Sequence, residues 1–144
     1  MIYSVDVEVT APVNDTEVTD RVVDAITNLF PDADVTEHPG EVVATTHQLE
    51  HFSERLHAQE ILDTARGQFE AGRDGDTFAF ALKKQAAFQG VVNFAVGNPD
   101  ELGDIHVRVR VDDPSVEEFV DYVAPPTQDG RPVTSDAEDR GPGN

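Results

Sequence analysis

Apolar and polar side chains alternate over the first residues of the chain, with Val5, Val7 and Val9 separated by acidic residues. A period of two is typical of a half-buried strand. The same period returns twice in the second half of the chain, and a short continuous apolar run lies between those two segments. These patterns predict strands over residues 2–11, 77–82, 91–96 and 105–111, and a hairpin over residues 35–46 that turns at Pro39 and Gly40.

Elsewhere the apolar positions recur every three or four residues, which predicts helices. The first predicted helix, residues 18–29, is capped by a polar side chain at residues 14–15, and the last starts at Pro114. Residues 49–71 also have the helical period, with a bend near Ala58 that divides them into two helices. This order of elements predicts an α+β fold, a mostly antiparallel sheet with helices packed on one face.

The charge of the chain is far from balanced. Twenty-nine Asp and Glu residues against ten Lys and Arg give a net charge of -19. In dilute buffer such a surface repels itself, whereas at about 1 M salt the Debye length is only about 3 Å and neighbouring carboxylates hardly interact. The basic residues are mostly arginine, with only two lysines. The composition therefore predicts a protein of a very salty cytoplasm, such as that of a haloarchaeon, but it does not indicate a function.

The absence of cysteine excludes a disulfide framework, a cysteine nucleophile and a thiolate metal site. No apolar stretch approaches the ~20 residues that span a bilayer, and the first residues lack the pattern of a signal peptide. We therefore expect a cytoplasmic protein without membrane contact.

Proline and glycine become frequent after Ala124, which predicts a single α+β domain over residues 1–124 and a disordered acidic Pro/Gly-rich tail over residues 125–144.

Several segments of the chain resemble one protein family. The most specific is Phe80–Gly90, which contains Lys-Lys-Gln-Ala-Ala, and the others are Ile61–Arg66, Val92–Phe94, the opening strand and Phe119–Pro125. Over about residues 1–125 the chain resembles the archaeal uncharacterised protein family 0201, as a haloarchaeal member. The resemblance implies a fold like that of the large-subunit ribosomal protein that binds 5S RNA. It also implies a role in RNA binding, and the family has no established catalytic residues.

The scarce basic residues gather near two of the predicted strands. Lys83 and Lys84 end one strand, and Arg108 and Arg110 share the solvent face of another strand with His106. If the two strands are neighbours, these five side chains form a positive patch on or beside the open sheet, which suits RNA phosphates. An alternative stays open, in which acidic side chains of the first strand pair with the two arginines across the sheet.

Residues 47–51, His-Gln-Leu-Glu-His, match the H-x-x-E-H pattern of a class of zinc peptidases. Two histidines four residues apart on a helix can share a metal, with Glu50 as the general base. Five histidines in an acidic chain make a chance match easy, and solvated histidines on a helix face are the ordinary explanation. We expect no metal, no cofactor and no catalytic residue. A metal-dependent hydrolase at His47, Glu50 and His51 is the interpretation that the sequence favours least.

The function favoured by the basic patch and the resemblance is non-enzymatic, an RNA-binding or ribonucleoprotein-associated module. The first alternative is a protein-interaction module without RNA binding, such as a homodimer formed through a sheet edge or through Val91–Val96. The sequence therefore leaves three partners to be distinguished, which are RNA, another protein and a second copy of the chain.

Overall fold

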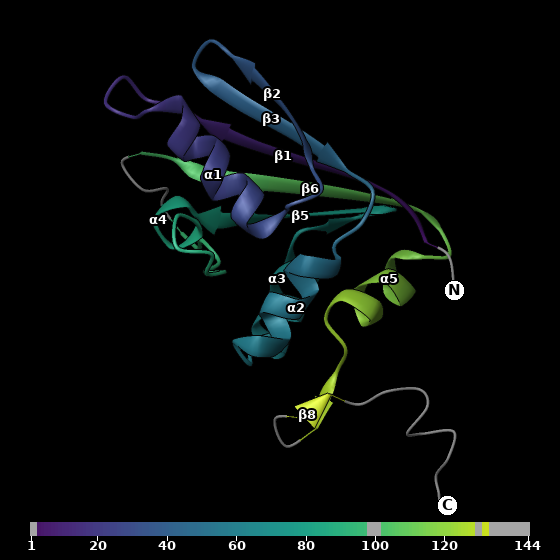
Figure 1. Ribbon diagram of the computed structural model, residues 1–144. Coiled ribbons are helices and arrows are strands. Elements are labelled where there is room, and N and C mark those ends of the chain that lie inside the picture. The colour runs from purple at the N-terminus through teal and green to yellow at the C-terminus, as the bar shows by residue number, and fades with distance from the viewer. Residues whose placement is uncertain (1–2, 98–101, 129–130, 133–144) are drawn as a thin grey trace, which may run out of the picture.

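A six-stranded sheet forms the scaffold of the fold (Figure 1). The structure, a computed structural model, describes residues 3–97, 102–128 and 131–132. Within them the sheet has the strand order β2-β3-β1-β6-β5-β4, and every neighbouring pair is antiparallel. The strands are β1 (Ser4–Pro12), β2 (Asp34–His38), β3 (Glu41–Thr46), β4 (Arg73–Asp74), β5 (Thr77–Lys83) and β6 (Asp104–Asp113).

The two long central strands, β1 and β6, give the sheet one buried face and one open face. Val7 lies opposite Val109 and Val9 lies opposite Val107, and all four side chains are buried. The residues that alternate with them in sequence are mostly polar and point to the other face. The period of two that predicts these strands from the sequence is therefore confirmed in the structure.

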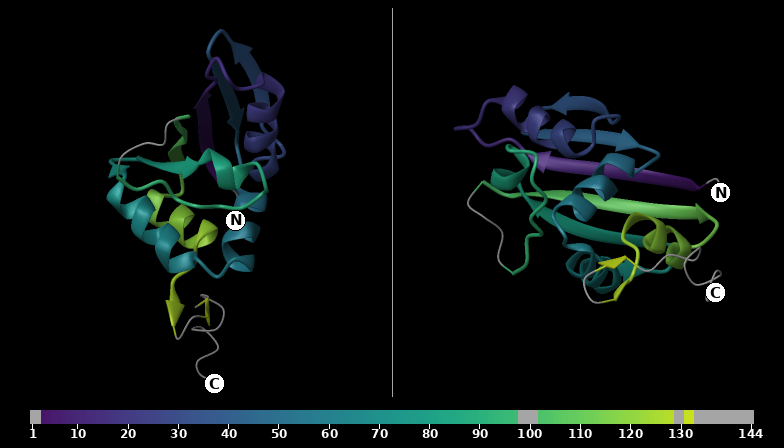
Figure 2. Two further views of the ribbon diagram at one scale, coloured as in Figure 1. Left: turned by 90° about the vertical axis from the view of Figure 1, so that its left-hand side faces the viewer. Right: turned by 60° about the horizontal axis from the view of Figure 1, so that its bottom comes forward.

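The described helices lie on the buried face of the sheet (Figures 1 and 2). They are α1 (Thr19–Leu29), α2 (Glu50–Ala58), α3 (Leu62–Ala71), α4 (Lys84–Ala87) and α5 (Val116–Val123). α2 contacts α1, α3 and α5, and so lies at the centre of the helical layer. Its Phe52 stacks on Phe30 and on Phe80 of β5, with ring centroids 5.3 and 5.5 Å apart. The predicted α+β fold, with an antiparallel sheet and helices on one face, is confirmed.

Two helix starts differ from the prediction. Asn14 does not cap α1, because its side-chain amide donates to Glu17 and to the carbonyl oxygen of Leu102. The last helix, α5, begins at Val116 rather than at Pro114. Ser115 caps it, and the Ser115 hydroxyl oxygen accepts a backbone N–H from the first turn. The predicted division of the middle helical region is confirmed, since α2 and α3 are separate helices.

The apolar run Val91–Val96 does not form the predicted strand. Apart from one isolated bridge, it follows the outer edge of β5 as a loop. The backbone N–H of Lys83 donates to the carbonyl oxygen of Asn93, and that of Ala95 donates to Ala81, both at 2.8 Å. Two apolar side chains of the run are buried in the core. The run is therefore apolar because it covers the end of β5, not because it extends the sheet.

The C-terminal residues lie largely outside the described part of the chain. Within that part, β7 (Thr127–Gln128) and β8 (Arg131–Pro132) form a short antiparallel pair. Most of the predicted disordered tail, residues 125–144, falls outside the described residues, so the tail and the 1–124 domain stay predictions. None of the described helices is both long enough and apolar enough to cross a membrane.

Gly72, directly after α3, approaches β5 so closely that it has no room for a side chain. A Cβ atom there would lie 1.8 Å from the carbonyl oxygen of Ala79. We expect Gly72→Ala to lower the free energy of unfolding by about 1–3 kcal/mol, because the backbone must shift to relieve the overlap. Gly67→Ala, inside α3 with open space around the new Cβ, is the control and should raise it by about 0.5–1 kcal/mol. Urea unfolding in molar KCl measures both. A Gly72→Ala variant as stable as the parent would contradict the close contact.

Candidate functional site

The open face of the sheet presents His106, Arg108 and Arg110 side by side on β6. All three side chains are exposed and point away from the buried face. β6 lies between β1 and β5, so residues of both strands flank them. On the β5 side, the register partners of Arg108 and His106 are Ala79 and Ala81, whose small side chains leave open space. This face therefore has room for a ligand beside the guanidinium of Arg108.

The two arginines of this face have different partners. Arg110 Nη2 donates to Asp6 Oδ2 at 2.8 Å across the sheet and to Asp112 Oδ2 at 3.4 Å. Arg108 lies opposite Glu8 in the register, yet no carboxylate of the described residues comes within 4.0 Å of its guanidinium. Cross-strand pairing, the alternative that the sequence leaves open, thus holds for Arg110 and leaves the charge of Arg108 available.

Lys83 lies on the same face, at the end of β5. Strand alternation places its half-buried side chain on the side of Ala79 and Ala81. Its register partner on β6 is Asp104, whose carboxyl group is buried, with Oδ1 lacking a hydrogen-bond partner among the described residues. Lys83 is therefore a further cation of the open face, opposite a buried acidic side chain.

Lys84 does not lie on the open face, although it follows Lys83 in the sequence. It is 1% exposed and forms the first residue of α4. Its Nζ donates to the carbonyl oxygens of Pro12 at 2.7 Å and Leu102 at 2.8 Å, and to Glu17 Oε1 at 3.0 Å. Its predicted position on a surface patch is wrong, because β5 ends at Lys83 and the helical turn that follows directs Lys84 into the interior.

Asn14 and Glu17 complete a buried polar network around Lys84. The side-chain amide of Asn14 donates to Glu17 Oε1 at 3.0 Å and to the carbonyl oxygen of Leu102 at 2.7 Å, and its backbone N–H donates to the same Glu17 oxygen at 3.0 Å. Burial alone would raise the pKa of Glu17, but the hydrogen bonds from Asn14 and Lys84 and the charge of the lysine outweigh it and lower that pKa. The network joins the end of β1, the start of α1, α4 and the segment before β6.

The histidines of the H-x-x-E-H pattern do not share a site. His47 lies in the connection before α2, and its Nδ1 is 3.0 Å from the carbonyl oxygen of Val5 and 3.2 Å from Asp6 Oδ1. His51 lies on α2, with Nδ1 3.7 Å from Glu54 Oε1. In the part of the chain that the structure describes, no three His, Asp or Glu side chains gather so as to hold a metal ion. The pattern requires both histidines on one helix, and α2 begins only after His47.

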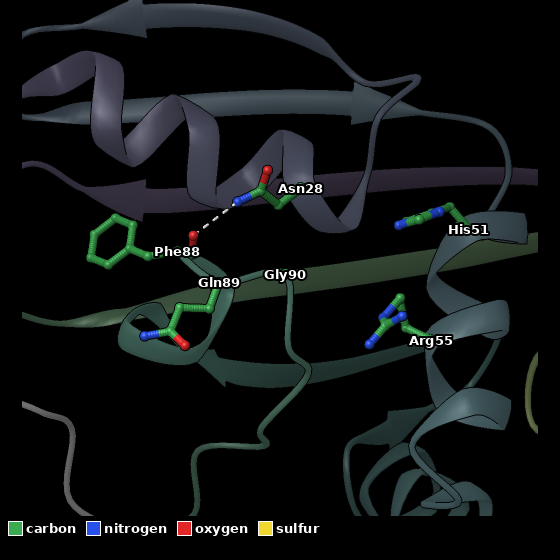
Figure 3. A pocket seen from close by; sticks show the side chains of 6 residues that line it. All are labelled: Asn28, His51, Arg55, Phe88, Gln89 and Gly90. Atoms are coloured by element: carbon green, nitrogen blue, oxygen red, sulfur yellow. Dashed lines mark hydrogen bonds between the residues drawn. The ribbon is translucent and has the colours of Figure 1, made fainter.

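A hollow that the sequence patterns do not indicate lies on the helical side of the sheet (Figure 3). Its volume is about 490 Å³, and it is open to solvent. It is lined by Asn28 of α1, His51 and Arg55 of α2, and Phe88, Gln89 and Gly90 after α4. The amide of Asn28 donates to the carbonyl oxygens of Ala87 at 3.0 Å and Phe88 at 3.2 Å, which holds this turn against α1. Three segments distant in sequence build the hollow, so no local pattern could have revealed it.

The basic side chains of residues 3–97 and 102–128 fall into two groups. Those within 4.0 Å of a carboxylate are Arg66, Arg73, Lys84 and Arg110. Those without such a partner among the described residues are Arg21, Arg55, Lys83 and Arg108. The second group occupies two places. Lys83 and Arg108 lie on the open face. Arg55 lines the hollow, and the Arg21 guanidinium carbon is 5.3 Å from the centre of the ring of Phe88, which also lines it.

Proteins of several archaea are similar to this chain over most of its length. A family model described as RNA binding matches residues 6–111. The UPF0201 protein of Thermococcus onnurineus is 36% identical over 135 residues, which cover 89% of this chain and 97% of that protein. This chain belongs to the UPF0201 family. A UPF0200/UPF0201 protein of Archaeoglobus fulgidus is 40% identical over 131 residues, which cover 90% of this chain but only 40% of that relative's length.

A solved structure supports the UPF0201 fold. The crystal structure of the UPF0201 protein from Methanococcus jannaschii matches this chain with a TM-score of 0.83 and 35% identity, over 90% of this chain and 99% of that one. The family resemblance stated from the residues is thus confirmed. A haloarchaeal source and a likeness to the 5S-RNA-binding ribosomal protein stay predictions.

The buried position of Lys84 leads to a test of its role in stability. We expect Lys84→Met to lower the free energy of unfolding by about 3–5 kcal/mol, because it leaves the buried Glu17 carboxylate without its cation. Lys83→Met removes the same charge from the neighbouring residue and should change stability by no more than about 0.5 kcal/mol. Urea unfolding of both variants in molar KCl separates the two roles. Equal losses from the two substitutions would contradict the buried network.

The lowered pKa of Glu17 predicts how acid affects stability. A carboxyl group whose pKa is lower in the folded state stabilises the fold above its unfolded pKa, here about 4.5, and this contribution is lost as the pH falls through the folded value. The stability difference between the parent and Glu17→Gln should therefore be largest near pH 7 and shrink below about pH 4.5. Denaturant unfolding of both proteins from pH 7 to pH 3 measures this difference, with Glu118→Gln, which changes an exposed side chain of α5, as control. A difference independent of pH would contradict the assignment.

Proposed function

We propose that this protein is a non-enzymatic RNA-binding module that contacts RNA with the open face of its sheet, through Lys83, His106 and Arg108. The observation that carries the proposal is the exposed guanidinium of Arg108, which has no carboxylate of the described residues within 4.0 Å. The family model described as RNA binding matches residues 6–111, a range that includes all three side chains, and this supports the proposal.

The chemistry of this face suits phosphate and sugar groups better than bases. A guanidinium offers five N–H donors in a planar fork and can bind two phosphate oxygens at once. The open faces of β1, β5 and β6 carry no Phe, Tyr or Trp among their described residues, so only His106 and the guanidinium planes can stack on a base. We therefore infer that the protein contacts the backbone of a structured RNA more than it reads single bases.

The balance of charge on the face restricts how RNA can approach. Over β1, β5 and β6 the three cations Lys83, Arg108 and Arg110 face four carboxylates, those of Asp6, Glu8, Asp112 and the buried Asp104, so the face is far less acidic than the chain of net charge -19 as a whole. The exposed carboxylates lie on β1 and at the end of β6, whereas β5 presents alanines beside Arg108. A phosphate therefore meets the least repulsion when it approaches Arg108 from the β5 side.

High salt changes which interactions supply the affinity for RNA. Counterion release supplies much of RNA affinity in dilute buffer, and this gain falls as the salt concentration rises. In the salty cytoplasm that the composition predicts, binding would depend on directed hydrogen bonds and on the fit of the RNA to the sheet. The same screening reduces the repulsion between RNA and the acidic surface.

The protein-interaction alternative has weaker support. The β5 edge of the sheet is covered by β4 at one end and by residues 93–95 at the other. The opposite edge, β2, carries Asp34, Glu37 and His38, and charged side chains on an edge strand discourage pairing with another sheet. A homodimer through residues 91–96 would use a run whose inner side chains are already buried in its own chain.

The proposal predicts the effect of removing the available cations of the open face. We expect the double variant Lys83→Gln with Arg108→Gln to recover at least about tenfold less RNA from a high-salt archaeal lysate than the parent, a loss of about 1.4 kcal/mol or more. Its free energy of unfolding should change by no more than about 0.5 kcal/mol, because neither side chain has an ion-pair partner among the described residues.

The matched control is Arg73→Gln, which removes one positive charge from an arginine that pairs with Glu117 at 2.6 Å. It should leave RNA recovery within about twofold of the parent. Sequencing and quantifying the recovered RNA for all three proteins gives the result. If the double variant recovers the same RNA in the same amount as the parent, the open face is not the RNA-binding surface.

A further inference from the structure

The hollow between α1, α2 and the turn after α4 has the size and side chains of a small-ligand site. Its volume of about 490 Å³ is large enough for a small molecule, and it is a shallow depression open to solvent rather than an enclosed cavity. Figure 3 shows His51 and Arg55 reaching into it from α2, opposite the turn that carries Gln89 and Gly90. The hollow lies on the helical side, so it is separate from the open face of the sheet.

Arg55 is the side chain that most directly indicates a ligand. No carboxylate of the described residues lies within 4.0 Å of its guanidinium, and its Nε is buried without a hydrogen-bond partner among them. A buried donor without a partner costs free energy, and a ligand acceptor would recover it. Since acidic residues outnumber basic ones almost three to one, an arginine that finds no carboxylate is available for an external anion.

Other groups around the hollow suit the same kind of anion. His51 lies one helical turn from Arg55 and donates or accepts through its ring. Gln89 lines the other wall, where its exposed side chain is directed away from Arg55 (Figure 3). Arg21, stacked on Phe88 at 5.3 Å, adds a further positive charge behind that wall. The carboxylate nearest to these groups on α2 is Glu54, 3.7 Å from His51 Nδ1.

We propose that this hollow binds a phosphate group carried by a nucleotide, with the Arg55 guanidinium on the phosphate oxygens and the His51 ring beside it. A planar guanidinium matches two phosphate oxygens, and the remaining volume accommodates the rest of a mononucleotide. The phosphate can belong to a free mononucleotide or to the 5′ end of an RNA strand. This site is independent of the open face and of the RNA contact proposed there.

The test measures binding of 5′-AMP, adenosine, 5′-phosphorylated tetra-adenylate and the same oligonucleotide without the 5′ phosphate, by isothermal titration calorimetry in 2 M KCl. We expect a phosphorylated probe to bind at least about tenfold more tightly than its unphosphorylated counterpart. Arg55→Gln should weaken this binding at least tenfold. His51→Glu, at a partly exposed residue of α2, puts a carboxylate one helical turn from Arg55 and should weaken it as much by pairing with the guanidinium.

Arg73→Gln and Arg108→Gln are the controls, and both should bind the phosphorylated probes within about twofold of the parent. Binding of AMP and the phosphorylated oligonucleotide alike would identify a mononucleotide site, and binding of the oligonucleotide alone would identify an RNA 5′ end. The inference would be overturned if the probes bound equally well with and without the phosphate, or if no probe bound. It would also be overturned if both hollow variants bound the probes as the parent does. Any of these results, together with an Arg108-dependent RNA recovery, would leave the RNA-binding proposal intact.

Discussion

The arrangement of the whole domain depends on the buried ion pair between Lys84 and Glu17. The pair and its partner Asn14 join three parts of the chain that are far apart in sequence, residues 12–17 between β1 and α1, the first turn of α4 and the segment before β6. Because both side chains are buried, salt in the solvent cannot screen them as it screens surface charges. One of the chain's two lysines is thus used in a buried ion pair that salt screens little.

The few basic side chains of this protein serve two purposes, because some form stabilising ion pairs and others have no carboxylate partner among the described residues. Several arginines form ion pairs with nearby carboxylates, as Arg66 does with Asp121 at 2.7 Å. The cations without such a partner among the described residues stand on opposite sides of the sheet, at the open face and at the hollow of Figure 3. Leaving a cation unmatched in a chain of net charge -19 is notable because carboxylates are plentiful. The two proposals follow from these two places, one for an RNA backbone and one for a nucleotide phosphate.

Local periodicity predicts β1, β5 and β6, the β2-β3 hairpin, four of the helices and the exposed position of Arg108, because alternation along a strand directly sets which side chains face solvent. It could not predict which way Lys84 points, since that depends on where β5 ends and α4 begins within one residue. The strand that it predicts over Val91–Val96 is wrong, because an apolar loop that covers a sheet edge has the same composition as a short strand. The hollow could not be predicted at all, because α1, α2 and α4 meet only in the tertiary structure.

The central claim, that the open face of the sheet contacts RNA, is tested most directly by ultraviolet crosslinking in a native high-salt lysate followed by mass spectrometry of the crosslinked peptides. The account predicts nucleotide adducts on peptides of β5 and β6, around residues 77–83 and 106–110, and their loss in the absence of irradiation. Adducts confined to peptides of the helical side, or none on a protein shown to be folded, would contradict it.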